Sequence, residues 1–376
     1  MSEATRNEIG AQETPLATRI KALIRTNGPI GITDYFALCL ADPDHGYYKT
    51  RDPFGRGGDF VTAPEISQLF GEMIGVYLVH AWQQHLKPKR DVRIAEIGPG
   101  RGTMMADILR TIARLAPELL EIASVHLVET SPRLRQIQSE TLANHAGRVT
   151  WHDSFDELPN GFLLLVANEF FDAVPIRQFV KLGATFRERF VGLDEADRLT
   201  FAVGAAGIDP SYLPENWRHM PDGTVFEVAP ARLAIMQMIA DRLFNSGGSA
   251  LFIDYGHLQT GFGDTLQAVY RHEFDPPLAH PGEADLTSHV DFQSLAEIAL
   301  ARSIHVNGAM SQGEFLIALG IAERAGRLGQ GKDAERQEAI RHDVMRLVSP
   351  DNGGMGELFK VLSVSSPAVK LQPFES

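Results

Sequence analysis

The sequence predicts an α/β protein with a doubly wound sheet, an N-terminal helical extension and an inserted β-meander. From residue 92 onward, short apolar runs alternate with amphipathic helical segments, which is the pattern of a parallel sheet with helical crossovers. Residues 177–182, 185–191 and 199–203 are instead three closely spaced β-runs, as expected of an antiparallel meander. With 376 residues, 44% of them hydrophobic, the chain can form one large α/β unit with additions, or two domains.

Residues 1–88 are expected to form a helical and loop extension, with the first 13 residues frayed. Thr14 and Pro15 predict the start of an amphipathic helix, and a second helix is expected at 33–41. Residues 42–60 are interpreted as a long loop with four aromatic side chains, which favour a packed lid or substrate-contact loop over disorder, namely Tyr47, Tyr48, Phe54 and Phe60. Thr62 and Glu65 then match a capping box before a further helix, which gives Glu65 a structural role.

Residues 89–376 are expected to form the sheet domain. The strands are predicted at 92–97, 124–129, 149–152, 162–168, 249–254 and 303–307, and the intervening helices at 103–115, 132–144, 230–244 and 292–302. Insertions at about 176–228 and 256–290 interrupt the alternation. Because ligands of open α/β sheets lie beyond the carboxyl ends of the strands, these insertions are candidates for substrate selection. A helix near 333–347 and an antiparallel edge strand at 359–363 complete the domain.

Composition excludes several classes of function. The formal net charge of −13 argues against a nucleic-acid partner, since such affinity comes from clustered Lys and Arg. The single cysteine, Cys39, lies in an apolar helical run and is interpreted as core filling rather than as a nucleophile. No run approaches the roughly 18 apolar residues of a membrane span, and the acidic start fits neither a signal nor a transit peptide. These features favour the cytoplasm, without an integral membrane segment.

A glycine-rich bend carries the strongest chemical signal. The strand predicted at 92–97 carries Glu96 near its end, and Gly98, Gly100 and Gly102 follow before a helix. Glycines permit positive dihedral angles and let a ligand approach the backbone. A dinucleotide fingerprint would need its third glycine at Thr103, and the ending of a phosphate loop is also missing. The alternative is a tight turn that binds no ligand.

Two further segments predict ligand contacts at the ends of the next strands. Glu129, which lies 31 positions beyond Gly98, could accept both hydroxyls of a ribose, although solvated acids are common at strand ends. Asp153 and Ser154 follow the third strand, where a carboxylate could accept an exocyclic amine. A role for either residue as a turn or helix cap is equally compatible with the sequence.

The fourth strand ends at Asn168, and Glu169 and Asp172 follow it beside two phenylalanines. Two acids and an amide with apolar neighbours are the composition of a small-molecule or side-chain pocket. Carboxylates would suit an arginine guanidinium, because they pair with its planar fork and offset its charge. Alternatively, Asp172 caps the following turn. Acids and histidines at 254–257 and 282–291 lack recognisable ligand spacing, so no metal is expected, and Asp291 also fits the N-cap of the next helix.

An acid two residues before a G-x-G-x-G bend resembles motif I of class I methyltransferases, in which the acid helps to hold the amino group of S-adenosylmethionine. The sequence is further identified as resembling the MidA-like family of methyltransferases, over roughly residues 17–365. The blocks that carry this resemblance are DPDHGYY, PFGRGGDFVTAPEISQLFGE, EIGPGRGTM, NEFFDAVP, FIDYGH and GEADLTSHVDF. This resemblance implies a Rossmann-like class I fold. It also implies that S-adenosylmethionine binds at Glu96, Gly98, Gly100, Gly102 and Glu129.

By analogy with the mitochondrial member, the resemblance also implies symmetric dimethylation of an arginine in a quinone-proximal subunit of respiratory complex I. The assignment of Glu169 and Asp172 to arginine recognition is an interpretation of their chemistry. The chain looks bacterial, so its protein partner could be the equivalent bacterial subunit. A small-molecule methyltransferase, a non-catalytic assembly factor and a nicotinamide oxidoreductase are the competing interpretations, and the sequence predicts no oligomeric state.

Overall fold

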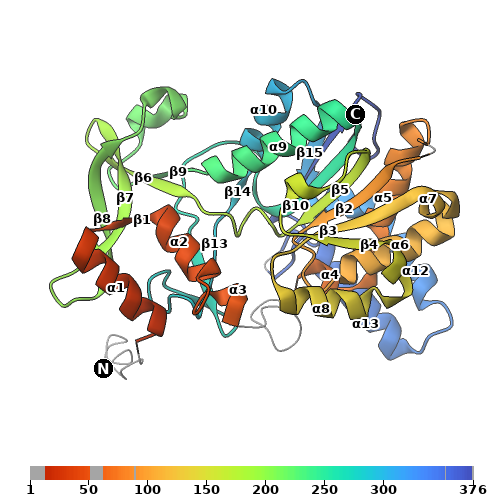
Figure 1. The fold of residues 1–376 in the computed structure, drawn as a ribbon, viewed down its shortest axis with the longest axis horizontal. Helices are drawn as coiled ribbons and strands as arrows, with labels where there is room; N and C mark the ends of the chain where they lie inside the picture. The colour runs from red at the N-terminus through yellow and green to blue at the C-terminus, as the bar shows by residue number, and fades with distance from the viewer. Residues whose placement is uncertain (1–12, 51–61, 89, 352, 375–376) are drawn as a thin grey trace. The chain divides into compact units, whose positions relative to one another are not determined.

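The computed structural model describes residues 13–50, 62–88, 90–351 and 353–374. The chain folds into two compact units (Figure 1). Unit 1 comprises Met1–Pro53, Pro175–Val228 and Phe262–Thr287, and unit 2 comprises Phe54–Val174, Ala229–Gly261 and Ser288–Ser376. The expected loop residues Phe54 and Phe60 lie outside the described residues, whereas Tyr47 is buried and begins a short helix.

Unit 2 holds the large sheet and most of the helices. Its strands are β2 (Val92–Ile97), β3 (Ala123–Val128), β4 (Val149–His152), β5 (Phe162–Asn168), β10 (Gly248–His257), β14 (Val290–Asp291), β15 (His305–Ser311) and β16 (Phe359–Ser366). Its helices are α4 (Ala63–Ile66), α5 (Gln68–Gln84), α6 (Thr103–Leu115), α7 (Pro117–Ile122), α8 (Pro132–Thr141), α9 (Pro230–Ser246), α10 (Phe292–Ala301), α11 (Gln312–Ala318), α12 (Ile321–Gly329) and α13 (Ala334–Val348).

The sheet follows the order β15-β16-β10-β5-β2-β3-β4, with β14 beside β10. The strands from β10 to β4 are parallel, which confirms the predicted doubly wound core. The expectation of an edge strand at 359–363 is wrong, because β16 lies between β10 and β15 and runs antiparallel to both. All residues of β16 but the last are buried, so this apolar run fills an interior position rather than the edge.

Each face of this sheet packs against its own helices. Alternate residues of the strands, such as Ile94 and Leu164, join α5 and α6 in one apolar core. The intervening residues, such as Ala95 and Leu165, pack with α9 and α10 in the other. This period-two alternation buries both faces, as crossover helices require. Glu96 occupies the sheet face of Ile94, so its carboxylate is buried by its position in the strand.

Unit 1 combines two smaller sheets with helices. Its elements are α1 (Pro15–Asn27), β1 (Ile30–Gly31), α2 (Ile32–Ala41), α3 (Tyr47–Thr50), β6 (Arg177–Leu182), β7 (Thr185–Leu193), β8 (Leu199–Gly207), β9 (Val225–Val228), β11 (Gln267–Tyr270), β12 (Glu273–Asp275) and β13 (Asp285–Thr287). β6, β7 and β8 form the predicted antiparallel meander, to which β1 and β9 add. Thr14 caps α1 as predicted, accepting a bond from the Ala17 amide.

The units divide the chain differently from the boundary expected near residue 88. Residues 62–88 belong to unit 2, because α5 buries its apolar side chains in the core of the large sheet. The insertions at 176–228 and 256–290 fall mostly in unit 1. Within that unit, Thr14 donates to the Pro281 carbonyl, and Gly282 at φ +77° packs directly on Leu16. These contacts between distant segments are not visible in the local sequence pattern.

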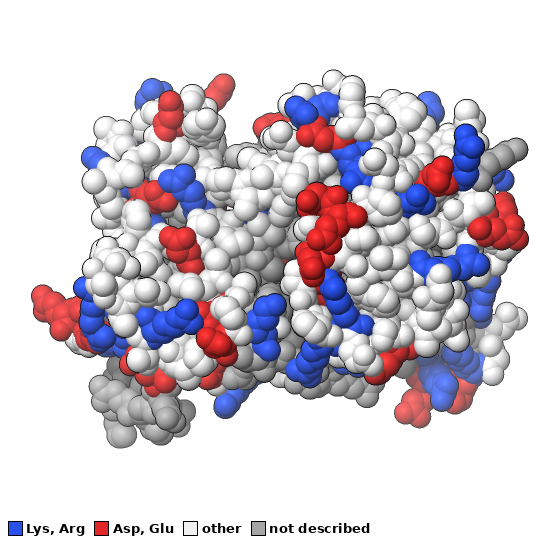
Figure 2. All heavy atoms as spheres, in the orientation of Figure 1, with Lys and Arg blue, Asp and Glu red and all other residues white. Residues whose placement is uncertain are grey.

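Among the described residues, no helix is both long enough and apolar enough to cross a membrane. On the face that Figure 2 shows, the described Lys and Arg side chains are interspersed with Asp and Glu. Cys39 is buried in α2, and burial raises the pKa of its thiol to about 12.

Candidate functional site

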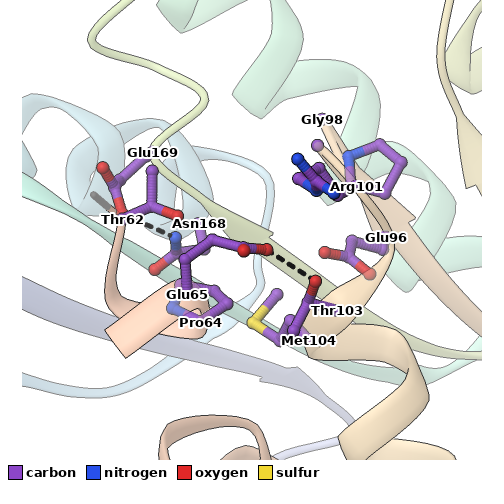
Figure 3. A pocket seen from close by; sticks show the side chains of 12 residues that line it. Thr62, Pro64, Glu65, Glu96, Gly98, Arg101, Thr103, Met104, Asn168 and Glu169 are labelled. Carbon is purple, nitrogen blue, oxygen red and sulfur yellow. Dashed lines mark hydrogen bonds between the residues drawn. The ribbon is translucent and has the colours of Figure 1, made fainter. Parts of the chain in front are cut away.

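A pocket lies in unit 2 at the carboxyl ends of β2 and β5. The predicted site residues that line it together are Glu96, Gly98, Gly100, Asn168 and Glu169. The lining is completed by Thr62, Pro64, Glu65, Pro99, Arg101, Thr103 and Met104. Figure 3 shows the labelled side chains converging on one space from the β2–α6 bend, the end of β5 and α4.

The glycine bend is built as the sequence predicts. Gly98, Gly100 and Gly102 have φ values of +68°, +51° and +80°, which side chains with a Cβ rarely adopt. A Cβ on Gly98 would also lie 3.3 Å from the Phe170 ring. Gly102 is the N-cap of α6 and packs against Gln138; it does not line the pocket. The bend therefore turns β2 into α6 while leaving its backbone open to a ligand at Gly98 and Gly100.

Glu96 supplies a buried acid to this pocket. Its side chain is 2% exposed, and Oε2 accepts no hydrogen bond from the part of the chain that the structure describes. Burial raises the pKa of the carboxyl to about 8. A cation placed against Oε2 would favour the ionised form and satisfy the unpaired oxygen.

Asn168 and Glu169 form a second polar pair at the end of β5. Asn168 Nδ2 donates to Glu169 Oε1 over 3.0 Å, and the Ala63 amide donates to the same oxygen over 3.4 Å. Within the described ranges, Asn168 Oδ1 accepts no hydrogen bond. Burial, and then the nearby Asp172 charge, raise the pKa of Glu169 to about 7. The backbone of Glu169 has φ +50°, a strained conformation that carries the chain sharply away from the strand.

Glu65 is a pocket residue whose role the sequence pattern predicts wrongly. The expected capping box is wrong, because the Thr62 side chain makes no cap hydrogen bond and α4 ends after one turn at Ile66. Glu65 Oε1 instead accepts a 2.6 Å hydrogen bond from the Thr103 hydroxyl at the start of α6 (Figure 3). The T-x-x-E pattern describes the chain locally, and no local signal indicates the approach of α6.

Glu129 lies close to the glycine bend without lining the pocket. Oε1 accepts from the Ser131 amide over 2.7 Å, and Oε2 accepts from Gln138 Nε2 over 3.4 Å. The same Gln138 nitrogen donates to the Gly100 carbonyl over 2.8 Å. Burial raises the pKa of Glu129, and the hydrogen bonds oppose this rise. The ribose-binding role of Glu129 stays a prediction.

Asp153 and Ser154 also lie outside the pocket lining. Asp153 is exposed and forms a 2.6 Å ion pair with Arg135, while its amide donates to Glu157. The Ser154 hydroxyl donates to Asp156 over 2.6 Å. These contacts agree with the alternative local roles, and adenine binding by either residue stays a prediction.

Asp172 lies in the loop that follows β5; it is buried and does not line the pocket. Its Oδ1 accepts from the following amide, that of Ala173, over 2.8 Å, as a turn-capping residue would. Burial raises the pKa of Asp172, whereas the Tyr255 hydroxyl and Arg232 oppose this rise. The expected pairing of Asp172 with Glu169 around a guanidinium is therefore corrected: of the two acids, Glu169 alone lines this pocket.

Other sequence interpretations concern residues outside the pocket. Asp291 is the N-cap of α10, as predicted, and accepts from the Ser294 amide over 3.2 Å. Among the residues placed by the structure, no group of three or more His, Cys, Asp or Glu side chains could hold a metal ion.

The pocket fits S-adenosylmethionine, a ligand with a positively charged ammonium and a sulfonium. Two buried oxygens, on Glu96 and Asn168, have no donor among the described residues and can accept hydrogen bonds from the ammonium group. Gly98 and Gly100 line the pocket without a side chain, so a ligand can approach their backbone directly. Glu65 and Glu169 add further acidic oxygens to the wall.

Comparison with known proteins supports this fit. Residues 73–310 match the family described as S-adenosyl-L-methionine-dependent methyltransferase. The chain is 35% identical to the mitochondrial protein arginine methyltransferase NDUFAF7 of Danio rerio, covering 94% of this chain and 86% of that protein. It is 33% identical to the NDUFAF7 of Homo sapiens, with 93% and 83% covered.

A solved structure is similar over nearly the full length. A protein from Burkholderia thailandensis, crystallised with S-adenosyl-homocysteine, superposes with a TM-score of 0.79 at 28% identity, covering 94% of this chain and 93% of that one. Its ligand is the demethylated product of the cofactor. The chain therefore belongs to the family of S-adenosyl-L-methionine-dependent methyltransferases.

Proposed function

We propose that this methyltransferase transfers methyl groups to an arginine of a protein partner. One observation carries the proposal: Asn168 and Glu169 place an acid–amide pair in the same pocket as Glu96 and the glycine bend. A carboxylate pairs well with the planar N–H fork of a guanidinium. The relatives named as protein arginine methyltransferases support the same assignment.

The pocket residues have distinct tasks in this reaction. When bound, S-adenosylmethionine supplies an electrophilic methyl group on a sulfonium and leaves as a neutral thioether. Glu96 binds the ammonium of the cofactor, which lowers the pKa of the carboxyl from about 8 and keeps it ionised. Asn168 Nδ2 and the Ala63 amide hold Glu169 Oε1, and no hydrogen bond from the described residues reaches Oε2.

Glu169 Oε2 is then the atom that accepts a guanidinium N–H and orients the attacking nitrogen. Alignment of this kind is the main contribution an enzyme can make to an in-line methyl transfer. A carboxyl with a pKa of about 7 can also accept the proton that the methylated nitrogen releases. The polypeptide thus supplies orientation and proton acceptance, without the need for a metal.

We further propose that the acceptor is a quinone-proximal subunit of a bacterial respiratory complex I, and that the product is symmetric dimethylarginine. The sequence resemblance and the similarity to the NDUFAF7 proteins motivate both statements. The test is incubation of the purified protein with that subunit and deuterated S-adenosylmethionine, followed by tandem mass spectrometry. Deuterated symmetric dimethylarginine at one site is the expected result.

Glu169→Gln should slow labelling at least about 100-fold in this assay. Glu121→Gln serves as the matched control, because Glu121 is exposed and lies outside the pocket. Asymmetric dimethylarginine would refute the stated product while leaving arginine as the acceptor. Label in a metabolite fraction, with none in protein, would show that the acceptor is a small molecule. An unlabelled arginine in every partner tested would overturn the proposal.

A further inference from the structure

The carboxylate of Asp254 gathers the loop that follows β5. Asp254 lies near the carboxyl end of β10, the strand beside β5, and is 1% exposed. Its Oδ2 accepts from the amides of Phe170, Phe171 and Asp172 over 3.2, 2.9 and 3.2 Å. Its Oδ1 accepts from its neighbour's amide, that of Tyr255, over 3.0 Å. One side chain therefore satisfies four backbone donors.

These bonds explain the strained backbone at Glu169. The Glu169 amide still continues the sheet, donating to the Ile253 carbonyl over 2.9 Å. The next three amides converge on a single oxygen, so the chain must reverse at Glu169, where φ is +50°. A glutamate keeps such a conformation only when its surroundings enforce it. Asp254 is the group that does so.

Arg232 closes the other end of the same loop. It is 2% exposed, and its guanidinium donates to the carbonyls of Val174 and His289 over 3.1 and 2.7 Å. Burial, and then the charges of Asp172 and Glu169, raise the pKa of Asp254, and Arg232 opposes this rise. The loop is thus held at its start by an acid and at its end by a base, both buried in unit 2.

We propose that Asp254 is a positioning residue for methyl transfer: it fixes the backbone of Glu169 so that the Glu169 carboxylate faces the pocket beside Asn168. Asp254 does not line the pocket. The inference rests on the proposed function, because it assigns to Glu169 the task of orienting the acceptor. The orientation of the acceptor by Glu169 would then depend on Asp254, a carboxylate on the neighbouring strand.

The first test is Asp254→Asn, which keeps the shape of the side chain. An asparagine has only one side-chain oxygen. If that oxygen accepts from the loop amides, the side-chain NH2 group faces the Tyr255 N–H, so the hydrogen bond to Tyr255 is lost. We expect kcat to fall about 100-fold, as for a misplaced catalytic group. Calorimetry should show unchanged affinity for S-adenosyl-homocysteine, because Glu96 and the glycine bend are untouched.

A double-mutant cycle with Glu169→Gln separates positioning from general stability. If Asp254 acts through Glu169, Asp254→Asn should cost less than about threefold in the Glu169→Gln background. Full additivity would overturn the proposal. Asp291→Asn is the matched control, since Asp291 is also a structural carboxylate with backbone and hydroxyl partners in unit 2; this variant should keep wild-type kcat.

Hydrogen exchange provides a readout that needs no activity. In Asp254→Asn, the amides of residues 170–172 should exchange at least about tenfold faster, while β5 and β10 keep their protection. Unchanged exchange would overturn the holding role of Asp254. If the wild-type protein methylated no arginine, the proposed function would fail, yet the exchange result would still decide whether Asp254 holds the loop.

Discussion

The Thr103 hydroxyl donates a 2.6 Å hydrogen bond to Glu65 Oε1 and thereby joins the first turn of α6 to α4. The glycine bend lies immediately before Thr103, so this bond connects the segment preceding the large sheet to the part of the chain that admits the cofactor. The methyltransferase pocket is therefore completed by residues that precede β2.

Replacement of Thr103 by valine should remove this bond and leave Glu65 with one donor fewer. We expect the free energy of unfolding to fall by about 1–3 kcal/mol, the usual cost of a lost hydrogen bond to a charged group. Thr103→Ser retains the hydroxyl, and its free energy of unfolding should fall by less than about 1 kcal/mol. Urea unfolding of both variants measures the difference, and equal values would show that the Glu65 bond contributes nothing to stability.

Gly98→Ala should impair cofactor binding. The new methyl group would need φ +68° and would lie 3.3 Å from the Phe170 ring. We expect the dissociation constant for S-adenosyl-homocysteine to rise at least about tenfold, equivalent to roughly 1.4 kcal/mol. Gly183→Ala is the matched control, because Gly183 has φ +58° with open space around its Cβ position. The prediction is refuted if calorimetry gives the two variants the same affinity.

Glu96→Gln should stabilise the ligand-free protein at neutral pH while weakening cofactor binding. Burial raises the pKa of Glu96 from 4.5 to about 8. The folded protein then binds more protons than the unfolded chain between these values, so stability falls as the pH rises through this window. A neutral glutamine removes that loss.

The gain should be at least about 1 kcal/mol at pH 8, because one pKa unit corresponds to roughly 1.4 kcal/mol. It should be absent at about pH 4, where the carboxyl is largely protonated in both states. Thermal unfolding at the two pH values gives the comparison. A variant less stable than the wild type at pH 8 would show that Glu96 is ionised and already paired.

The rate of methyl transfer should rise with pH through about 7. Burial and the Asp172 charge set the pKa of Glu169 near this value, and the ionised form is the one that accepts a guanidinium N–H. With S-adenosylmethionine saturating, so that Glu96 is already paired, kcat/KM for the protein acceptor from about pH 5.5 to 8.5 should follow a single ionisation. If this ionisation were absent, or if it persisted in Glu169→Gln, the group that titrates would not be Glu169.

Arg232→Met should destabilise the protein strongly. The buried guanidinium donates to several backbone carbonyls and to the Ser288 hydroxyl, and its charge offsets Asp172 and Asp254. We expect a loss of about 3–5 kcal/mol, as for other buried charges left unpaired. Arg242→Met, on the same helix but with one exposed bond to the Pro159 carbonyl, should cost less than about 1 kcal/mol. Similar losses in denaturant unfolding would contradict the argument.

The sequence determined the parts of this protein that depend on neighbours along the chain. β2, β4 and β5 have the predicted bounds, because short apolar runs between helical segments pair as parallel strands under crossover helices. The glycine bend could be predicted because glycine readily adopts positive φ. The role of Glu96 could be predicted because it lies two residues before the first of these glycines. Together with the motif resemblance, these local features were sufficient to predict the cofactor.

Tertiary structure decided what depends on contacts between distant segments. The position of β16 between β10 and β15, the approach of Thr103 to Glu65 and the capture of the loop after β5 by Asp254 each join residues that are far apart in sequence. A local pattern such as T-x-x-E or an acid-rich strand end has the same appearance whether its carboxylate caps a turn or faces a pocket. Only the packing of other elements against it decides, since burial and the available donors fix where a carboxylate can lie.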